Sequence, residues 1–449
     1  MSVGVVAGVV AYLELFRALD YGHGIVRALL LVGLAGAACW LLGRVERGAG
    51  LGPSTWMLLP AALVAMLVNL VAGGQAISRT VATHEIQLDQ GQNTFRAIQY
   101  LRLGANPYGR SALLDPASYS ELVTSLQRHP SCLVRPSSSA WRAAFRRYWL
   151  EVSRPVPAVV MPAIADNPEC QTHQRALASL GYKYGPALLA FYAPFVWGFD
   201  KPGIFVAHIV LVLLATWLLA WFGRNGAGFW TGSWPLAAGG ALLFLAPSHL
   251  RHNVLASSAS DLGPTLAAVA AVVCLTRGKD GWAAFLIGVS VACKVLPGLI
   301  YVPLLLSCRR RTWAVGLVPV LAAYVPFLAW DAQGFVNNTF LFNLGRPADS
   351  TALAFSISGT TRALVQVAGL AAACFSLNRA CKQAWTLSAV LSYLWVAHVA
   401  VLLSGPIFHN NYLVWLLPLL SLTYVAGNGS TARAETSASE AATLRSPVP

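Results

Sequence analysis

The sequence WMLLPAALVAMLVNLVAGGQAISRTVATHEIQLDQGQNTFRA, residues 56–97, begins with an apolar run, Trp56 to Ile77, that is long enough to cross a lipid bilayer. Asp89 follows this run closely, in a chain with only 17 acidic residues against 31 basic ones. Beyond Asp89, apolar residues recur at helical spacing until Gly104 and Asn106-Pro107 break the pattern. The stretch therefore predicts a membrane helix, an acidic residue at its mouth and a short second helix.

Two interpretations of Asp89 follow from this position. In one, Asp89 is a solvated acid in a loop, followed by a short surface helix. In the other, it is a catalytic base at the face of the membrane, with Glu85, four residues earlier, as the alternative acid. The polar residues that the rest of the chain places near these two acids decide between the two interpretations.

The composition predicts a membrane protein. Of the 449 residues, 56% are hydrophobic and only 11% are charged, whereas a soluble domain carries about 25% charged residues. We therefore expect an all-α polytopic membrane protein with about 10–12 membrane helices, since each crossing takes about 20 apolar residues. The net charge of +14 comes from short arginine clusters between apolar runs. Such clusters mark the cytoplasmic side of a membrane protein and argue against nucleic-acid binding.

The apolar pattern divides the chain into three parts. We expect additional membrane helices in residues 1–54, a main membrane domain in residues 55–426 and a disordered cytoplasmic tail in residues 427–449. The first helix, within residues 1–22, contains Glu14, so it is either a poor membrane helix or an interfacial one, and the second is a span expected at residues 25–42.

A long loop and a series of spans make up the main membrane domain. The loop covers residues 79–183, far longer than ordinary connections. The expected spans are 203–222, 235–249, 261–276, 313–330, 360–376, 384–404 and 412–426.

The arginine clusters orient these spans. Arg44 and Arg47 mark the cytoplasmic side, so Asp89, one crossing later, is expected on the external side. The basic residues that follow the later spans fall on the cytoplasmic side only if residues 184–199, which contain Pro194, do not fully cross the membrane.

Lys294 lies inside an apolar run, Trp282 to Leu306, that has cations on both sides. Because both flanks should be cytoplasmic, we interpret the run as two short halves folded at Lys294 to Gly298. An ionisable residue at membrane depth is costly and usually functional. The alternatives are a lysine that reaches the membrane surface and one that bonds backbone carbonyls at the break.

The same topology gathers polar residues on the external side. Arg346 and Asp349 fall in the loop 331–358, and His409 falls in the last external turn. A carboxylate among cations suits transfer from a lipid-linked phosphate, because the acid accepts a proton from the attacking hydroxyl and the cations stabilise the leaving phosphate. For His409 alone, an ordinary hydrogen-bonding role is the alternative.

Three further features bear on the expected site. Arg251 and His252, together with Asn253 and Asp261, precede a span and are candidates for the lining of the same cavity. The chain has no Asp-x-Asp pair that would clamp a metal ion, so we expect no metal and no cofactor. Cys132 and Cys170 lie in the long loop, where they would form a disulfide if the loop is on an oxidising side.

The order of these signals resembles the membrane-embedded C-type glycosyltransferases, closest to the polyprenyl-phosphate-mannose-dependent mannosyltransferase-like family. The segments that carry the resemblance are Asp89 to Tyr108, Tyr182-Lys183-Tyr184-Gly185-Pro186, Gly288 through Lys294 to Pro297, and Pro406 to Pro418 with His409. The chain departs from the family's pattern at Gly185-Pro186, where two prolines are frequent, and at Arg251-His252-Asn253, where a Gly-Gln pair is common.

The resemblance implies an inverting, metal-independent transfer of a sugar from a polyprenyl phosphate on the external side, with Asp89 as the essential acid. We expect a multi-pass protein of the inner, or plasma, membrane that transfers a hexose, mannose first, to a lipid or glycan acceptor. Lys294, Arg346, His409, Tyr184, Arg251 and His252 are the expected substrate contacts. The competing hypotheses are a transporter or flippase for a lipid-linked glycan and an assembly protein whose long loop docks partners.

Overall fold

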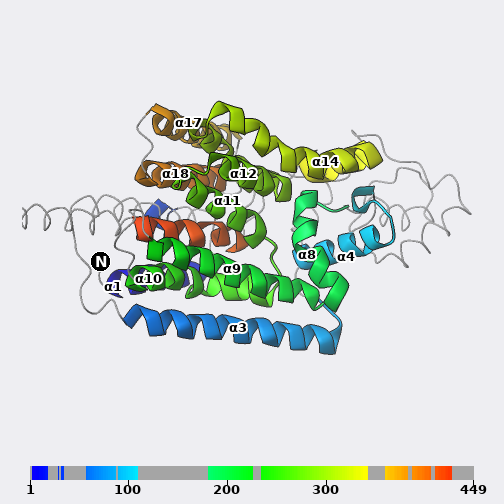
Figure 1. The fold of residues 1–449 in the computed structure, drawn as a ribbon, viewed down its shortest axis with the longest axis horizontal. Coiled ribbons are helices and arrows are strands. Elements are labelled where there is room, and N and C mark those ends of the chain that lie inside the picture. Colours follow the sequence, from blue (N-terminus) through cyan, green and yellow to red (C-terminus); the bar gives the residue numbers. More distant parts are fainter. Residues whose placement is uncertain are drawn as a thin grey trace, which may run out of the picture.

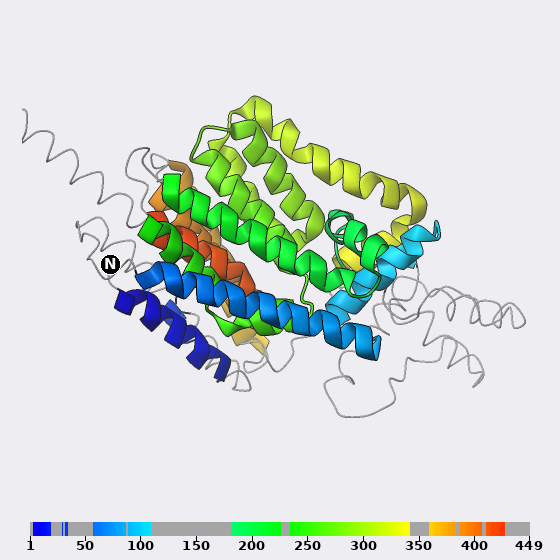
Figure 2. The same ribbon diagram turned by 60° about the horizontal axis from the view of Figure 1, so that its bottom comes forward.

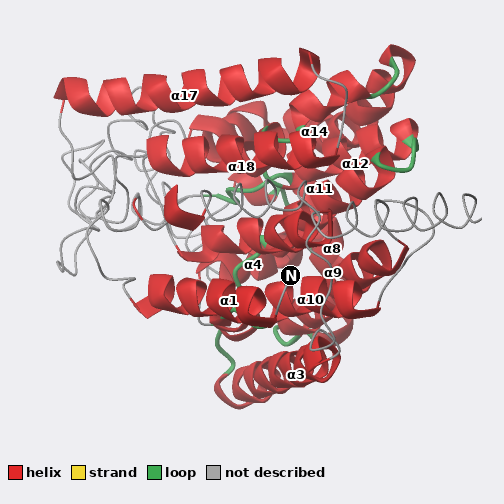
Figure 3. Ribbon diagram, turned by 90° about the vertical axis from the view of Figure 1, so that its left-hand side faces the viewer, coloured by secondary structure: helices red, strands yellow, loops and turns green. Residues whose placement is uncertain are grey.

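A computed structural model of the chain describes residues 3–18, 29, 32–34, 57–86, 89–109, 181–225, 234–341, 359–382, 387–405 and 410–426. These residues form a bundle of helices (Figure 1) and contain no β-strand (Figure 3). The expected span 25–42, most of the loop 79–183, the loop containing Arg346, the turn containing His409 and the tail lie largely or wholly outside the described residues.

Three of the described helical segments are long and apolar enough to cross a membrane, namely Leu58–Thr83, Gly203–Arg224 and Arg310–Val336. They belong to α3 (Leu58–Thr83), α9 (Gly203–Asn225) and α14 (Trp313–Val336). Helix α3, with 26 residues, is about 39 Å long at 1.5 Å per residue, which exceeds the hydrocarbon core of about 30 Å. The prediction of an all-α polytopic membrane protein is confirmed.

Further helices complete the bundle. They are α1 (Val3–Ala18), α10 (Trp234–Leu245), α11 (Leu262–Leu275), α12 (Asp280–Cys293), α17 (Gly359–Lys382), α18 (Leu387–Ser404) and residues 416–426, which follow the 3₁₀ segment η8 (Asn410–Trp415). Helices α3 and α17 lie at opposite edges of the bundle (Figures 1 and 3). Both expose large apolar side chains such as Leu67 and Leu370, as helices that face lipid do.

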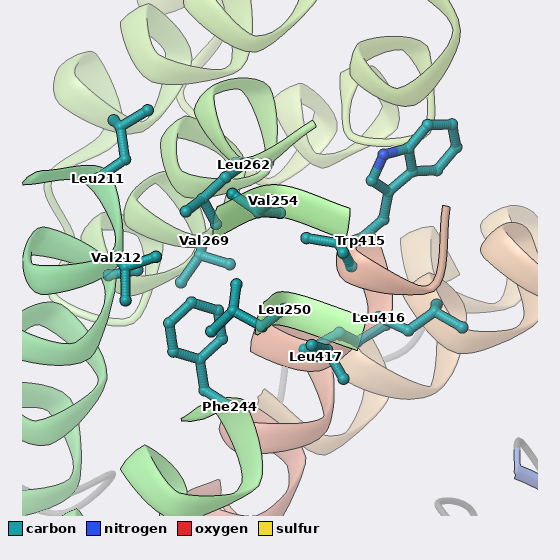
Figure 4. Packing of buried hydrophobic residues seen from close by; sticks show 14 of the residues in the cluster. Leu211, Val212, Phe244, Leu250, Val254, Leu262, Val269, Trp415, Leu416 and Leu417 are labelled. Atoms are coloured by element: carbon teal, nitrogen blue, oxygen red, sulfur yellow. The ribbon is translucent and has the colours of Figure 1, made fainter. Parts of the chain in front are cut away.

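The centre of the bundle is a continuous apolar core. Leu211, Phe244 and Val269 come from α9, α10 and α11 and are almost completely buried. They pack with Leu250 and with Leu416 of the last helix (Figure 4). This core brings the last helix against the middle of the chain.

Helices α4 (Asp89–Arg102) and α8 (Pro186–Phe199) form a small pair at one end of the bundle, on the right of Figure 1. The interpretation of α4 as a surface helix is wrong, because Phe95 and Ile98 are buried in the core. Helix α8 has 14 residues, or about 21 Å, and contains Pro194. This is shorter than the hydrocarbon core of about 30 Å, and the incomplete crossing of residues 184–199 stays a prediction.

The chain folds back on itself at Lys294, as predicted. Lys294 ends α12 in an extended conformation, φ −145° and ψ 118°, and α13 (Val295–Leu299) and the 3₁₀ segment η5 (Val302–Ser307) follow. Gly298 packs so closely on α12 that a Cβ there would lie 2.4 Å from the Cα of Val291. The backbone N–H of Arg309 donates to Asp280 Oδ2 over 3.1 Å, so the hairpin returns to the end where α12 began.

A second irregular segment joins α10 to α11 and includes the π-helix η4 (Leu250–Ala256). Side chains from distant helices satisfy its backbone. Glu14 of α1 accepts hydrogen bonds from the backbone N–H and the hydroxyl of Ser248 at 2.6 and 2.7 Å. Arg79 of α3 donates to the carbonyl oxygen of Ala256 at 2.6 Å. Irregular backbone within a membrane requires such internal partners.

Figure 2 shows α3 along the side of the bundle, with α1 beside it. Helix α3 continues past the predicted end at Ile77 to Thr83. Asn69, in the middle of α3, donates to the carbonyl oxygen of Leu245, the last residue of α10, at 2.8 Å. Helices α1 and α3 thus supply the polar groups that the break after α10 needs.

We predict that Gly288→Ala lowers the melting temperature of the purified protein. A Cβ at Gly288 would lie 2.0 Å from the carbonyl oxygen of Gly316 in α14, and overpacking of this kind costs about 1–3 kcal/mol. Gly281→Ala on the same helix is the matched control, because nothing lies within 4 Å of its Cβ position. Equal melting temperatures for the two variants would contradict the packing of α12 against α14.

Candidate functional site

A buried ion pair lies where the hairpin of α12 and α13 meets the start of α11. Lys294 Nζ is 2.5 Å from Asp261 Oδ1, and the two side chains are 8% and 0% exposed. Asp261 is the residue that precedes the first turn of α11, and Lys294 is the residue at which α12 ends. The tight packing of α11 against α12 brings the two charges together.

The first turn of α4 reaches the same ion pair. Gln90 Oε1 accepts hydrogen bonds from Lys294 Nζ at 3.4 Å and from the backbone N–H of Ser260 at 3.0 Å. Gly91 makes this approach possible, because a Cβ there would lie 2.2 Å from Ser258 Oγ. Ser258 has a φ of +68°, a conformation that is costly for a residue other than glycine. Asp89 begins α4 and directly precedes Gln90, so its backbone is next to the Lys294 site.

Tyr184 lies against the same lysine, with its ring centroid 4.4 Å from Lys294 Nζ. The hydroxyl of Tyr108 donates to the carbonyl oxygen of Tyr184 at 2.7 Å, and the N–H of Tyr182 donates to the carbonyl oxygen of Pro107 at 3.1 Å. The N–H of Gly185 donates to the carbonyl oxygen of Cys293 at 2.8 Å. Tyr108 and Tyr182 flank the part of the long loop that the structure does not describe. These hydrogen bonds therefore hold both flanks of that part near Lys294.

Burial controls the protonation of the tyrosine that makes this clamp. Tyr108 is 1% exposed, and desolvation raises its pKa well above the ordinary value of 10.0. Tyr108 therefore stays a neutral hydrogen-bond donor at physiological pH.

The last part of the chain reaches the ion pair through Trp415. Its indole N–H donates to Asp261 Oδ1 at 3.0 Å, so one carboxylate oxygen holds both Lys294 and Trp415. The ring of Tyr412 stacks on Trp415, with centroids 4.7 Å apart. His409 lies three residues before Tyr412, outside the described residues.

Besides the five-residue α13, which begins at the residue after Lys294, three longer helices begin around Lys294. They are α4, α8 and α11, each of 14 residues, and they are represented there by Gln90, Tyr184 and Asp261. The N-terminal end of a helix carries a partial positive charge and unpaired N–H groups, both of which favour anions. Asp261 balances the charge of Lys294, so the helix ends leave this region favourable for a further negative group.

The structure places the other expected site residues as follows. Glu85 is exposed, and its backbone N–H bonds Thr83 Oγ1 at 3.3 Å, beside the end of α3. Arg251 and His252 lie on η4, where Arg251 is half-buried and His252 is exposed. The structure therefore brings together the start of α4, Tyr184 and Lys294 among the residues that it describes. The remaining expected residues, Arg346, Asp349, His409, Cys132 and Cys170, lie outside the described residues.

Two residues of the site were missed by the sequence analysis. Gln90 was passed over because an uncharged amide next to an acid carries no signal of its own. Trp415 was counted as part of the last apolar span, and only its position after a polar turn distinguishes it from the other tryptophans. In the part of the chain that the structure describes, no three His, Cys, Asp or Glu side chains are grouped as metal ligands would be.

A cavity of about 250 Å³ opens between α4 and α8, away from the ion pair. Its lining includes Ile98, Gln99, Arg102, Val196 and Trp197. The side-chain oxygen of Gln99 is buried there and has no hydrogen-bond partner. The cavity thus lies beside the second half of the helix whose first turn meets Lys294, and its lining combines apolar side chains with Arg102 and Asp200.

A family model, described as glycosyltransferase family 87, matches residues 182–425, more than half of the chain. The chain belongs to glycosyltransferase family 87. The matched residues include Tyr184, Asp261, Lys294 and Trp415, whereas Asp89 and Gln90 precede them. No curated protein and no solved structure matched the chain.

Membership in family 87 identifies the chain as a membrane-embedded glycosyltransferase, and the expected C-type family resemblance is confirmed. The protein therefore takes a sugar donor and an acceptor as its substrates. The ion pair of Lys294 and Asp261, the first turn of α4 and the Trp415 contact form its candidate site.

We predict that Lys294→Met destabilises this glycosyltransferase, because it leaves the Asp261 carboxylate buried without its partner. Loss of one member of a buried ion pair costs about 3–5 kcal/mol. The double variant Lys294→Met with Asp261→Asn has no unpaired charge, so it should melt closer to the wild type while it forms no product. Thermal unfolding and a transfer assay on both variants check this, and an active double variant would contradict a functional role for Lys294.

Proposed function

We propose that this family 87 glycosyltransferase transfers a hexose, with mannose as the first candidate, from a polyprenyl-phosphate donor to a lipid or glycan acceptor. The observation that carries the proposal is the position of Lys294. It lies within the bundle where three helices begin, beside the first turn of α4. A cation surrounded by helix N-termini suits the phosphate of a lipid-linked sugar donor.

In the proposed reaction, Asp89 is the general base. It takes the proton of an acceptor hydroxyl, and the hydroxyl oxygen forms a bond to the anomeric carbon of the donor sugar. The bond between that carbon and the phosphate oxygen breaks on the opposite face, so the configuration inverts. The phosphate leaves with both bonding electrons, and Lys294 stabilises the negative charge.

Asp89 is assigned this role through its neighbours in the chain. Gln90 contacts Lys294 Nζ, so Asp89, the preceding residue, begins α4 close to the proposed phosphate position. Glu85 is the alternative acid, and it is exposed beyond the end of α3. The geometry of Gln90 therefore favours Asp89.

Further proposed contacts come from the segments around the site. Tyr184 faces Lys294 directly, and Trp415, which contacts Asp261, follows His409 by six residues in the chain. Arg346, Arg251 and His252 are proposed as further phosphate or sugar contacts. We propose a reaction without a metal ion, because a single phosphate can be held by these cations alone.

We further propose that the site opens on the external side of the inner, or plasma, membrane. The support is the distribution of charge. Arg309, Arg310 and Arg311 follow the returning arm of the hairpin, beside Asp280 at the start of α12. Lys294 lies at the other end of α12. By the positive-inside rule the arginines would be cytoplasmic, so the Lys294 end of α12 would be directed towards the external side.

We predict that Asp89→Asn reduces product formation by about 10²–10⁴-fold, the usual contribution of a general base. Glu85→Gln is the matched control and should keep activity close to the wild type. The assay uses purified protein in lipid nanodiscs, radiolabelled polyprenyl-phosphate mannose and a lipid extract as acceptor, with and without EDTA. Loss of activity in Glu85→Gln and not in Asp89→Asn would move the base to Glu85.

The same assay separates the enzyme from a transporter or flippase. A transporter would move the lipid-linked sugar across the membrane and form no product with any acceptor. Product formation by the wild type, unchanged by EDTA, is the expected result, and inhibition by EDTA would contradict a metal-independent reaction.

A further inference from the structure

Asp261 is central to the site, although the proposed reaction gives it no role. Its side chain is completely buried, and one oxygen accepts hydrogen bonds from both Lys294 and Trp415. These donors come from segments that are 33 and 154 residues away along the chain. A buried carboxylate is costly, so one that holds two separate segments contributes to their arrangement.

The first interaction of Asp261 fixes the position of the Lys294 ammonium group. A lysine has four rotatable bonds in its side chain and is a compact point charge that adopts many positions when it is free. Asp261 Oδ1, Gln90 Oε1 and the ring of Tyr184 surround the ammonium group of Lys294. The charge is thereby held against the first turn of α4 before any substrate arrives.

The second interaction of Asp261, with Trp415, fixes the segment that follows the last polar turn. Trp415 is 3% exposed and stacks on Tyr412, which follows the turn that contains His409. The indole N–H needs a buried partner, and Asp261 supplies it. The position of Trp415 in η8 (Asn410–Trp415) therefore depends on the same oxygen as the position of Lys294.

The geometry points to Asp261 as a positioning residue that sets Lys294 against the donor phosphate and also anchors η8 through Trp415. This inference rests on the proposed function for the identity of the phosphate. A positioned group must be held by its own supporting contacts if it is to act with precision, and Asp261 is the contact that both groups share. Asp261 itself need not touch the substrate.

The experiment compares Asp261→Asn, Trp415→Phe and Ser290→Ala in the nanodisc assay. Asp261→Asn keeps a hydrogen-bond acceptor for Trp415 and removes the charge that holds Lys294. Trp415→Phe removes the indole N–H and leaves the ion pair. Ser290→Ala is the matched control, because its hydroxyl makes one buried hydrogen bond between α12 and α11, to the carbonyl oxygen of Pro264 at 2.9 Å.

The main readout is the inhibition constant of sugar-free polyprenyl phosphate, which reports the phosphate contact alone. Asp261→Asn should weaken this inhibition about tenfold, the effect expected when one charge-assisted contact is misplaced. Trp415→Phe should leave the inhibition constant unchanged and lower kcat, because only η8 loses its anchor. Ser290→Ala should change neither, even if it lowers the melting temperature.

A second readout does not depend on the donor. Lys294 that has lost its counter-ion should react faster with a small acylating reagent, as measured by mass spectrometry of the labelled peptide. Asp261→Asn should increase labelling of Lys294 relative to the wild type, whereas Trp415→Phe and Ser290→Ala should not. If polyprenyl phosphate fails to inhibit the wild type, the proposed donor is wrong, and the labelling still decides the role of Asp261.

A purely structural role for Asp261 predicts a different pattern. Its variant would then lose activity only in proportion to the unfolded fraction, with an unchanged inhibition constant and unchanged labelling of Lys294, and this result would overturn the inference. If Asp261→Asn does not fold, Lys294→Arg replaces it, because arginine keeps the ion pair and moves the charge. An unchanged inhibition constant in folded Lys294→Arg would likewise overturn it.

Discussion

Opposite charges on Lys294 and Asp261 lie inside an apolar bundle, and the cost of burying them constrains everything around them. Each charge is tolerated only because the other is 2.5 Å away and further polar groups complete the contacts. Gln90, Tyr184 and Trp415 supply those contacts from three separate segments. The start of α4, the end of the long loop and the segment that contains Trp415 are thereby fixed to one point.

Two breaks in the helices, at Lys294 and at η4, bring these two charged residues to the same place. A continuous helix through Lys294 would leave no room for the hairpin, and a continuous helix through η4 would carry Ser258 and Asp261 away from Gly91 and Gln90. Each break exposes backbone groups that lipid cannot satisfy. Glu14 of α1 and Arg79 of α3 bond the irregular segment before α11, which explains why these polar residues occur on otherwise apolar helices.

Much of this was predictable from local patterns in the sequence. The hairpin at Lys294 follows from Pro297-Gly298 and from the cations on both flanks, and the helix after Asp89 follows from its apolar spacing and its Gly104 break. The partners of Lys294 were not predictable, since Gln90 is 204 residues away and an amide gives no sign of its contact. Such contacts between distant residues depend on how the helices pack across the whole chain, and a local sequence pattern carries no information about that packing.

A structure of the protein with a polyprenyl-phosphate sugar bound tests the central claim most directly. The account predicts that the phosphate lies in contact with Lys294, with the sugar between it and the start of α4, and with Asp89 facing the anomeric carbon from the opposite side. A phosphate bound far from Lys294, or an Asp89 carboxylate directed into open solvent away from the sugar, would contradict the account.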